Sequence, residues 1–248
     1  MRRKNFLQSL LILAALILLS SNSISESKAI RTPEGNMPLV HWAVVESVDG
    51  KMNEILNIGA RTLAAVVPNE LGTYCLYGGV DIKNQNVMRL LEIYESYEAY
   101  RIHSTSEAFQ QYRAERLPIL KNLKLLEVNA IVLEQKISGV GSIVCMHRYE
   151  IDPKSLSEYQ KLVVDESVRA VRDDDGVMGI FITAEHDNPN IIHTMEIFKD
   201  NSARENYFNS KYFKSLHNKI SRMIKNQQDI ENLSTKIILS DKGFKYKM

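Results

Sequence analysis

Residues 89–96 read RLLEIYES and residues 193–200 read HTMEIFKD, so that Glu92 recurs as Glu196 at an offset of 104 residues (196 − 92 = 104). The same offset aligns further identical residues without a gap: Glu46 with Glu150, Glu54 with Glu158, Gly72 with Gly176, Ala99 with Ala203, Ser106 with Ser210 and Phe109 with Phe213. A period of roughly 100 residues is too long for a solenoid repeat. The sequence therefore predicts two copies of one small domain that share an interface.

Both copies have the same order of predicted elements. In the first copy, β-branched and aromatic runs predict strands over 40–47, 73–82, 87–95 and 123–135, and helical spacing predicts helices over 49–67 and 97–117. In the second copy, we expect strands over 142–151, 177–185, 191–199 and 234–239, and helices from 152 to about 172 and from 200 to about 224. Each copy is thus β-α-β-β-α-β, the ferredoxin-like arrangement.

Some predicted strands, such as GIFITA at 179–184, are apolar on both faces, which requires burial of both faces. Helices can cover one face, and the sheet of the other copy can cover the second. We therefore predict an α+β fold of two fused ferredoxin-like repeats whose sheets pack face to face, a dimeric α+β barrel in one chain with an internal cavity. The predicted domains are 40–136 and 141–240, with a linker at 30–39 and a basic tail at 241–248.

The first 29 residues have the pattern of a secretory signal peptide. A basic start, Arg2-Arg3-Lys4, precedes an apolar run from Phe6 to Leu19, and a polar stretch ends in Ser27-Lys28-Ala29. The run is shorter than the roughly 20 residues of a membrane span. We expect an exported chain, periplasmic or secreted, that has no membrane attachment after cleavage behind Ala29. An uncleaved membrane anchor is the alternative.

Composition narrows the kinds of partner. The net charge of +1 provides no bulk attraction to nucleic acid or anionic lipid, so we expect neither as a partner. The sequence contains no zinc-type cysteine spacing, no phosphate-binding glycine loop and no GxSxG motif. Cys75 and Cys145 lie in apolar runs and are expected to be buried thiols, although export would permit a disulfide. A monomer or weak homo-oligomer is expected.

One segment, EIYESYEAYRIHSTSEAFQQY (92–112), resembles the antibiotic biosynthesis monooxygenase superfamily. The shared pattern is a Glu-x-aromatic strand end, an Ala-x-x-x-His helix and a following Phe, here at Glu92, Tyr94, Ala99, His103 and Phe109. The resemblance implies the dimeric ferredoxin-like barrel. It also implies either the activity of quinol monooxygenases, which oxygenate polyphenols without metal or flavin, or that of haem-degrading monooxygenases.

The second copy resembles the haem-degrading branch through GIFIT (179–183) and YFNSKYFKSLH (207–217). The resemblance implies that His217 would ligate haem iron. Two positions depart from that branch, because Tyr207 stands where it carries a Trp and His147 stands where it carries a strand Asn. Since the enzymes of that branch depend on all three residues, these departures weigh against haem degradation and leave haem binding open.

Two glutamates stand out because Glu92 and Glu196 interrupt apolar strands at equivalent positions. A carboxylate inside a barrel is either paired or shifted in pKa. Each glutamate is therefore either a structural hydrogen-bond partner or a base that deprotonates a phenol. Arg89 and Arg148 are possible ion-pair partners for them.

Three histidines have alternative interpretations. His103 is either a proton-transfer group at a cavity wall or a surface residue paired with Glu107. His147 alternates with Cys145 and Tyr149 on one strand face, which is directed to cavity or core. His217 lies on or beside an apolar helical stripe and is either structural or a haem ligand.

The leading hypothesis is an exported monooxygenase, an oxidoreductase that oxygenates a quinol or another small polyphenolic aromatic without a cofactor. The alternatives are a haem-binding or haem-degrading protein and a non-catalytic binding or structural module. We expect the cavity between helices and sheet. The predicted catalytic residues are His103, Glu92 and Tyr94, and the predicted ligand-binding residues are His147, Tyr207, His217 and Glu196. Differences between the copies predict at most one competent site in the chain, or two different ones.

Overall fold

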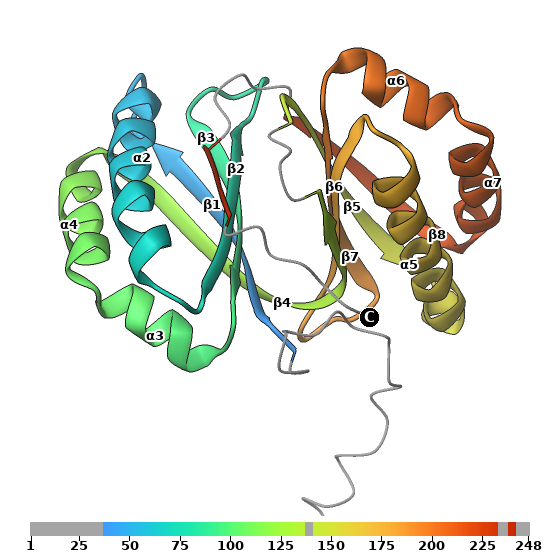
Figure 1. The fold of residues 1–248 in the computed structure, drawn as a ribbon, viewed down its shortest axis with the longest axis horizontal. Coiled ribbons are helices and arrows are strands. Elements are labelled where there is room, and N and C mark those ends of the chain that lie inside the picture. The colour runs from blue at the N-terminus through green and yellow to red at the C-terminus, as the bar shows by residue number, and fades with distance from the viewer. Residues whose placement is uncertain (1–36, 137–140, 233–237, 242–248) are drawn as a thin grey trace, which may run out of the picture.

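The computed structural model describes residues 37–136, 141–232 and 238–241 (Figure 1). The predicted signal peptide, most of the predicted linker and the basic tail from 242 onward lie outside these ranges. Leu39, assigned to the linker from the sequence, already begins the first strand. Within the described ranges, no helix is both long and apolar enough to cross a membrane.

The first unit runs β1 (Leu39–Ser47), α2 (Met52–Asn69), β2 (Thr73–Val80), β3 (Val87–Tyr94), α3 (Tyr97–Thr105), α4 (Glu107–Arg116), a 3₁₀ turn (Leu117–Ile119) and β4 (Leu120–Gln135). The second runs β5 (Ile143–Ile151), a 3₁₀ turn (Pro153–Ser155), α5 (Leu156–Asp173), β6 (Val177–Glu185), β7 (Ile191–Phe198), α6 (Asn201–Asn209), α7 (Lys211–Ile220), a 3₁₀ turn (Ser221–Met223), β8 (Ile224–Asn232) and β9 (Ile238–Asp241). The start of α2 recurs in α5 at 104 residues (156 − 52 = 104), and the starts of α3 and α4 recur in α6 and α7 at the same offset. The repeat predicted from the sequence is therefore a structural repeat.

The second helix predicted in each unit is in fact two helices. Ser106 separates α3 from α4, and its hydroxyl accepts a hydrogen bond from the Phe109 backbone N–H. Ser210 does the same between α6 and α7 for Phe213. A serine cap satisfies an otherwise unpaired N–H at the start of a helix. Each serine therefore starts a second helix at a point where the apolar pattern of the sequence predicts one continuous helix.

The end of the second unit also differs from the prediction. Helix α7 ends at Ile220, and strand β8 begins at Ile224, where a helix end was predicted. The predicted strand over 234–239 overlaps only the short strand β9, because residues 233–237 lie outside the described part. Strand β8 contains the polar run KNQQD at 225–229, which carries no alternating apolar signal, so pattern reading missed it.

One nine-stranded sheet joins both units in the order β8-β5-β7-β6-β4-β1-β3-β2-β9. Strand β4 is shared, since it pairs with β1 through Leu120–Val128 and with β6 through Val128–Gln135. In the other direction, β8 pairs with β5 and β9 pairs with β2. Strand β4 of the first unit thus extends to pair with the second unit, and β9 of the second unit pairs with the first, which the sequence did not predict.

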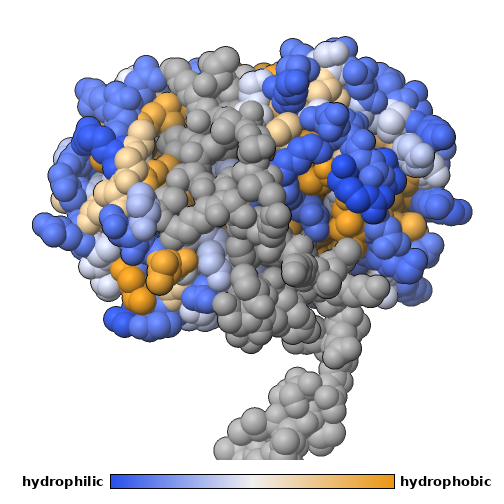
Figure 2. All heavy atoms as spheres, viewed as in Figure 1, coloured by the Kyte–Doolittle hydropathy of each residue, from blue (hydrophilic) through white to orange (hydrophobic). Residues whose placement is uncertain are grey.

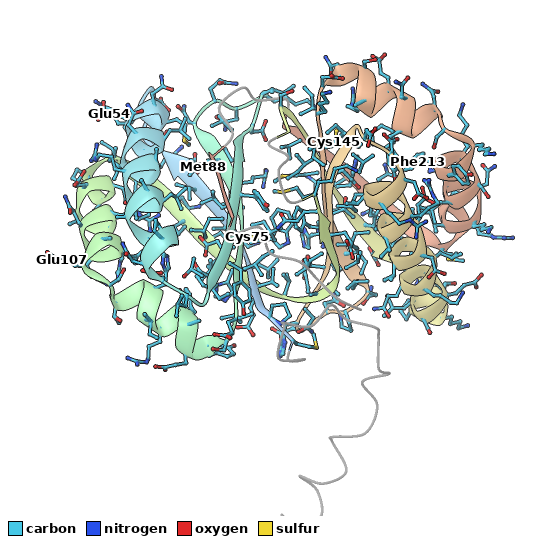
Figure 3. The ribbon with its side chains drawn as sticks, in the orientation of Figure 1. Glu54, Cys75, Met88, Glu107, Cys145 and Phe213 are labelled. Atoms are coloured by element: carbon cyan, nitrogen blue, oxygen red, sulfur yellow. The ribbon has the colours of Figure 1, made fainter. Side chains whose placement is uncertain are left out.

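The two halves of the sheet face each other, with α2, α3 and α4 outside one half and α5, α6 and α7 outside the other (Figure 1). Side chains from both halves occupy much of the space between them (Figure 3). Trp42 Nε1 donates a hydrogen bond to Thr183 Oγ1 at 2.9 Å, and the rings of Tyr77 and Phe181 lie 5.2 Å apart. The predicted face-to-face barrel is confirmed, and its centre is an apolar core contributed by both units.

The outer surface over both helical layers is mainly hydrophilic, with scattered apolar side chains (Figure 2). Cys75 and Cys145 lie in different halves of the sheet, are buried and form no disulfide, as predicted (Figure 3).

Candidate functional site

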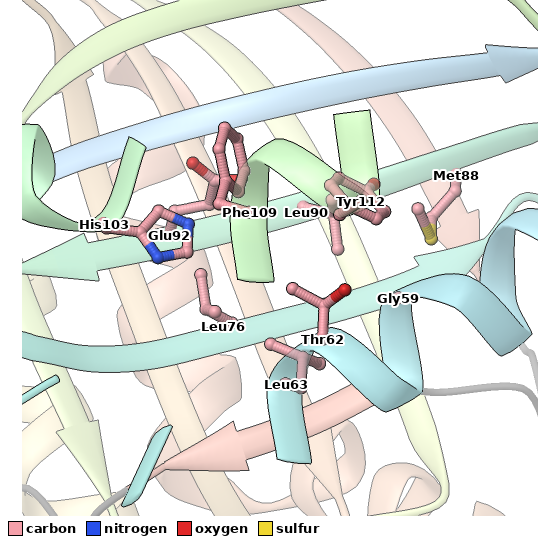
Figure 4. A pocket seen from close by; sticks show the side chains of 10 residues that line it. All are labelled: Gly59, Thr62, Leu63, Leu76, Met88, Leu90, Glu92, His103, Phe109 and Tyr112. Atoms are coloured by element: carbon pink, nitrogen blue, oxygen red, sulfur yellow. The ribbon is translucent and has the colours of Figure 1, made fainter. Parts of the chain in front are cut away.

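In the first unit, a small cavity lies between the helices and the outer face of the sheet (Figure 4). Glu92 on β3 and His103 on α3, both predicted from the sequence, line it together with the rings of Phe109 and Tyr112 on α4. The cavity volume is about 50 Å³. This volume holds water-sized molecules but is well below the roughly 150 Å³ of a cavity that binds benzene.

Glu92 lies in an apolar and aromatic environment that favours its neutral form. Burial raises the pKa of Glu92 to about 7, and a hydrogen bond from Tyr94 and the charge of Arg116 only partly oppose this shift. Tyr94 Oη lies 3.3 Å from Glu92 Oε2, and His41 Nδ1 lies 4.0 Å away. Glu92 thus combines a raised pKa with close aromatic neighbours, which is a feature of functional carboxylates.

The neighbours of Glu92 in the structure differ from the arginine partners suggested by the sequence. Arg89, one of the two arginines suggested as possible partners of the strand glutamates, instead lies 3.8 Å from Asp81. Positions 89 and 92 differ by three along one strand, so their side chains leave opposite faces of the sheet. His41 and Arg116 near Glu92 were missed, since neither position carries a motif that distinguishes it from an ordinary strand or helix residue.

His103 is buried and does not pair with Glu107. Its Nδ1 lies 2.8 Å from Glu70 Oε2, an atom that also accepts a hydrogen bond from Thr73. Burial lowers the pKa of His103, although the Glu70 carboxylate opposes this. The ring packs against Phe109 at 4.5 Å between ring centres. His103 is thus a neutral, well-anchored histidine whose ring borders the cavity beside Glu92.

The second unit has a larger cavity at the equivalent place, with a volume of about 150 Å³. It lies between the outer face of β5, β6 and β7 and the helices α5, α6 and α7. All four residues predicted to bind a ligand line it: His147, Glu196, Tyr207 and His217. The structure therefore brings together, around one cavity, residues that are up to 70 positions apart (217 − 147 = 70).

A histidine–carboxylate pair forms the polar part of this cavity. His147 Nε2 lies 3.5 Å from Glu196 Oε2, and each side chain is only 13% exposed. His147 also stacks on Tyr149 at 5.8 Å between ring centres, which confirms that the two share a strand face. Arg148, the other arginine suggested as a possible partner, lies on the opposite face, where its Nε is 3.8 Å from Glu185.

Aromatic side chains form the opposite wall. Tyr207 on α6 is buried, and its ring lies 5.2 Å from that of Phe213. Burial raises the pKa of Tyr207, with a smaller contribution from the negative charge of Glu166, so its hydroxyl stays protonated at neutral pH. His217 is exposed and stacks on Phe213 at 6.0 Å, so it borders the cavity from the solvent side.

Thr194 on β7 was not predicted from the sequence. It lines the cavity, is 3% exposed, and its hydroxyl has no hydrogen-bond partner within the described part of the chain. A buried unpaired hydroxyl is costly unless a ligand or water satisfies it. In the sequence, this threonine is one of several polar residues in mixed strands, and only its burial reveals its position at the cavity wall.

Haem, which the resemblance implied, is tested by this geometry. A cavity of about 150 Å³ matches one benzene ring and is too small for a tetrapyrrole. His217, the residue that would ligate the iron, lies at the exposed rim. The residues as placed do not fit a haem. In addition, no cluster of three or more His, Cys, Asp or Glu that could hold a metal ion occurs in the described ranges.

Comparison with known proteins finds solved structures of the same fold and a family match within the second unit. Residues 142–219 match the model of the antibiotic biosynthesis monooxygenase family. The fold is similar to that of a proposed monooxygenase from Lactobacillus acidophilus NCFM, with a TM-score of 0.79, 14% identity, and coverage of 86% of this chain and 100% of that one. No curated protein matches the sequence.

A second proposed monooxygenase, from Fusobacterium nucleatum, has a TM-score of 0.77 and 18% identity over 85% of this chain and 97% of its own. An anthrone oxidase-like protein has a TM-score of 0.54 and 8% identity, and the similarity covers 82% of this chain and 94% of that one. At these identities, the solved structures establish the fold alone. Residues 142–219 of the second unit are therefore similar to the antibiotic biosynthesis monooxygenase family, and the chain as a whole has the fold of these solved structures.

Proposed function

We propose that the chain is a cofactor-independent monooxygenase that oxygenates a single-ring quinol or related phenol in the cavity of the second unit. The observation that carries this proposal is the benzene-sized cavity of about 150 Å³ with the His147–Glu196 pair on one side and aromatic rings on the other. The first unit has the predicted Glu92, Tyr94 and His103, but its cavity is too small for an aromatic ring.

The cavity groups divide the chemistry between them. Glu196 and His147 accept the proton of a ring hydroxyl, which requires an approach of about 3 Å. Thr194 and the neutral Tyr207 donate hydrogen bonds to the oxygens of the substrate. Phe213 packs against the ring and restricts water. Removal of the hydroxyl proton raises the electron density of the ring, and the resulting anion reacts directly with dioxygen.

The reaction balances without an external reductant. Hydroquinone (C₆H₆O₂) and O₂ give hydroxyquinone (C₆H₄O₃) and H₂O, so one oxygen atom enters the ring and the other leaves as water. The quinol supplies all four electrons that reduce O₂, two through its oxidation to the quinone level and two through hydroxylation of the ring. The protein therefore needs to supply only a base, hydrogen-bond donors and a cavity that limits water.

Oxygen consumption with hydroquinone tests the proposal, with ¹⁸O₂ used to count the atoms incorporated. Glu196→Gln and His147→Gln are each expected to lower kcat/KM by about a hundredfold or more, the usual contribution of a positioned base. Glu205→Gln and His186→Gln, at exposed positions with the same chemistry, are the matched controls and should retain activity.

Oxygenation that survives in Glu196→Gln and is lost in Glu92→Gln would move the reaction to the first unit. Absence of turnover with a series of single-ring quinols, in a folded wild-type chain, would contradict the proposal.

Titration with hemin supplies a further test. We expect no sharp Soret band from bound haem, and a Soret band that disappears in His217→Ala would favour the haem alternative.

Export remains part of this proposal, and it rests on the sequence of residues 1–29. The expected N-terminus of the mature protein is Ile30. Sequencing the N-terminus of protein from an extracytoplasmic fraction checks this, and Met1 retained in a cytoplasmic fraction would contradict it.

A further inference from the structure

A third cavity lies on the other side of the sheet, between the two facing halves. Its volume of about 420 Å³ is the largest of the three and falls in the range of small-molecule sites, roughly 300–1,000 Å³. Its walls come from β1, β3 and β4 of the first unit and from β5, β6, β7 and β8 of the second. The proposed oxygenase reaction takes place in the outer cavity of the second unit, and of its proposed groups only His147 and Thr194 also border this third cavity.

Two equivalent rows of residues form the polar walls. In the first unit, Val44 is the direct cross-strand partner of both Arg89 and Lys124, which places the two cations on either side of it on one face. In the second unit, Arg148 takes the place of Val44 (148 − 44 = 104) and is the cross-strand partner of His193. The two rows line the same cavity, so three permanent cations converge on it.

Two of these cations form ion pairs with carboxylates, and both pairs are too long to be hydrogen bonds. Arg89 lies 3.8 Å from Asp81, and Arg148 lies 3.8 Å from Glu185, both longer than a hydrogen bond. Lys124 forms no ion pair with any residue in the described ranges. Glu185, the one carboxylate among the described residues that line the cavity, already accepts a hydrogen bond from His193 at 2.9 Å.

Arg89 has a hydrogen-bond donor that is not satisfied within the described part of the structure. Its Nε is buried and has no acceptor within the described part of the structure. Burying a guanidinium donor without a partner is costly, so an acceptor supplied by a ligand would be strongly favoured. An anion placed among the three cations would balance their positive charge. Its oxygen atoms would supply the missing hydrogen-bond acceptor.

The remaining wall is apolar and aromatic. Trp42, Leu126 and Met146 line the cavity, and Trp42 is 8% exposed. The indole N–H is already bonded to Thr183, so the indole contributes only apolar surface to the cavity. A ligand that satisfies both walls has an anionic head and a flat apolar body.

We propose that this inter-sheet cavity binds a small aromatic carboxylate, with the carboxylate held by Arg89, Lys124 and Arg148 and the ring packed against Trp42. The site is built from both repeats and lies on the face of the sheet opposite the proposed oxygenase cavity. It is a second small-molecule site with its own specificity, independent of catalysis.

The single tryptophan of the chain allows a direct test. Trp42 lines the inter-sheet cavity and not the outer cavities, so its fluorescence reports occupancy of this site alone. Titration of the purified chain with benzoate is expected to change the Trp42 emission saturably. Benzamide, which has the same shape without the charge, is expected to bind at least about tenfold more weakly.

Variants of the cations identify the site. Lys124→Gln and Arg148→Gln should each raise the Kd for benzoate about tenfold or more, as expected for loss of a charged hydrogen bond. Lys121→Gln, on the same strand but exposed and paired with Glu46, is the control and should bind as wild type. Circular dichroism verifies that each variant is folded.

An unsaturable response to benzoate would overturn the proposal. Equal affinity in Lys124→Gln, Arg148→Gln and Lys121→Gln would overturn it as well. If inorganic phosphate displaces benzoate at a similar concentration, the site selects anions without regard to the ring, and the aromatic part of the proposal is wrong.

Discussion

The two buried strand glutamates, Glu92 and Glu196, occupy equivalent positions, but their neighbours differ and give them different chemical environments. Glu92 contacts Tyr94, whose equivalent beside Glu196 is Phe198. Glu196 contacts His147, whose equivalent in the first unit is Ala43. The nearest polar neighbour of Glu92 is therefore a tyrosine, with His41 farther away at 4.0 Å, whereas Glu196 lies 3.5 Å from an imidazole. Substitution of neighbours around a fixed position has given the chain two dissimilar cavities.

The raised pKa of Glu92 predicts a pH-dependent stability. Burial raises this pKa from about 4.5 to about 7, so between these values the folded chain binds more protons than the unfolded chain, and rising pH lowers the free energy of unfolding. Glu92→Gln removes the charged form. It is expected to be more stable than wild type by about 3 kcal/mol at pH 8, with the difference vanishing toward pH 4.5.

Urea unfolding of both chains at several pH values measures this difference. Glu205→Gln, at an exposed position on α6, serves as the control for a change in net charge and should follow wild type. A Glu92→Gln chain that is less stable than wild type at pH 8 would show that the buried carboxylate is ionised and stabilising.

At the scale of elements, a glycine–alanine contact fixes each helix pair to the sheet. A Cβ atom added to Gly72 would lie 2.5 Å from the Cβ of Ala99 on α3, and one added to Gly176 would lie 2.5 Å from the Cβ of Ala203 on α6. These are two of the identities that revealed the repeat. They recur because neither partner has room for another carbon, so α3 and α6 approach the chain closely just before β2 and β6.

Gly176→Ala is expected to destabilise the chain by about 1–3 kcal/mol through overpacking. The backbone of Gly176 has no positive φ, so the contact with Ala203, and not the backbone, is the cause. Ala203→Gly alone should cost about 1 kcal/mol through helix propensity. Chemical unfolding of the two single variants and the double variant measures the coupling.

The double variant restores the space, so its loss of stability should be smaller than the sum of the two single losses. Strict additivity would mean that the glycine is required for a reason other than the contact. The equivalent cycle at Gly72 and Ala99 repeats the test in the first unit, with the same expected sign.

At the scale of the whole molecule, the two units cannot bury their inner faces separately. Strand β4 belongs to both halves of the sheet, and the central core contains residues of both. An isolated unit would expose Phe181 or Trp42 and lose the hydrogen bond between Trp42 and Thr183. The repeat is therefore a duplication in sequence and one cooperative body in structure.

We accordingly predict a single unfolding transition. Trp42 fluorescence reports the interface between the units, and far-UV circular dichroism reports all helices and strands, so the two midpoints in urea should coincide. Thr183→Val leaves the buried indole N–H unpaired and should lower both midpoints together, by about 1–3 kcal/mol in stability. Separate midpoints for the two signals would show that the units unfold independently.

The sequence by itself determined the repeat, its period and the class of fold. Internal identities and alternating apolar patterns are local or evenly spaced, so they can be recognised in the sequence without knowledge of the tertiary structure. Glu92 and Glu196 were located for the same reason, since each interrupts an apolar strand at an equivalent position, whereas His103 and Tyr207 were located through the family resemblance. The polar strand β8 was misplaced because that signal is absent from it.

Only the tertiary structure decided which residues meet. The exchange of β4 and β9 between the units, the pairing of His103 with Glu70, and the assignment of Arg89 and Arg148 to the inter-sheet cavity all depend on contacts between distant segments. Cavity volume is likewise a property of packing, because two repeats with the same fold leave about 50 Å³ in one unit and about 150 Å³ in the other. A few side chains of different size at equivalent positions produce this difference, and no single-sequence pattern encodes the space that remains between them.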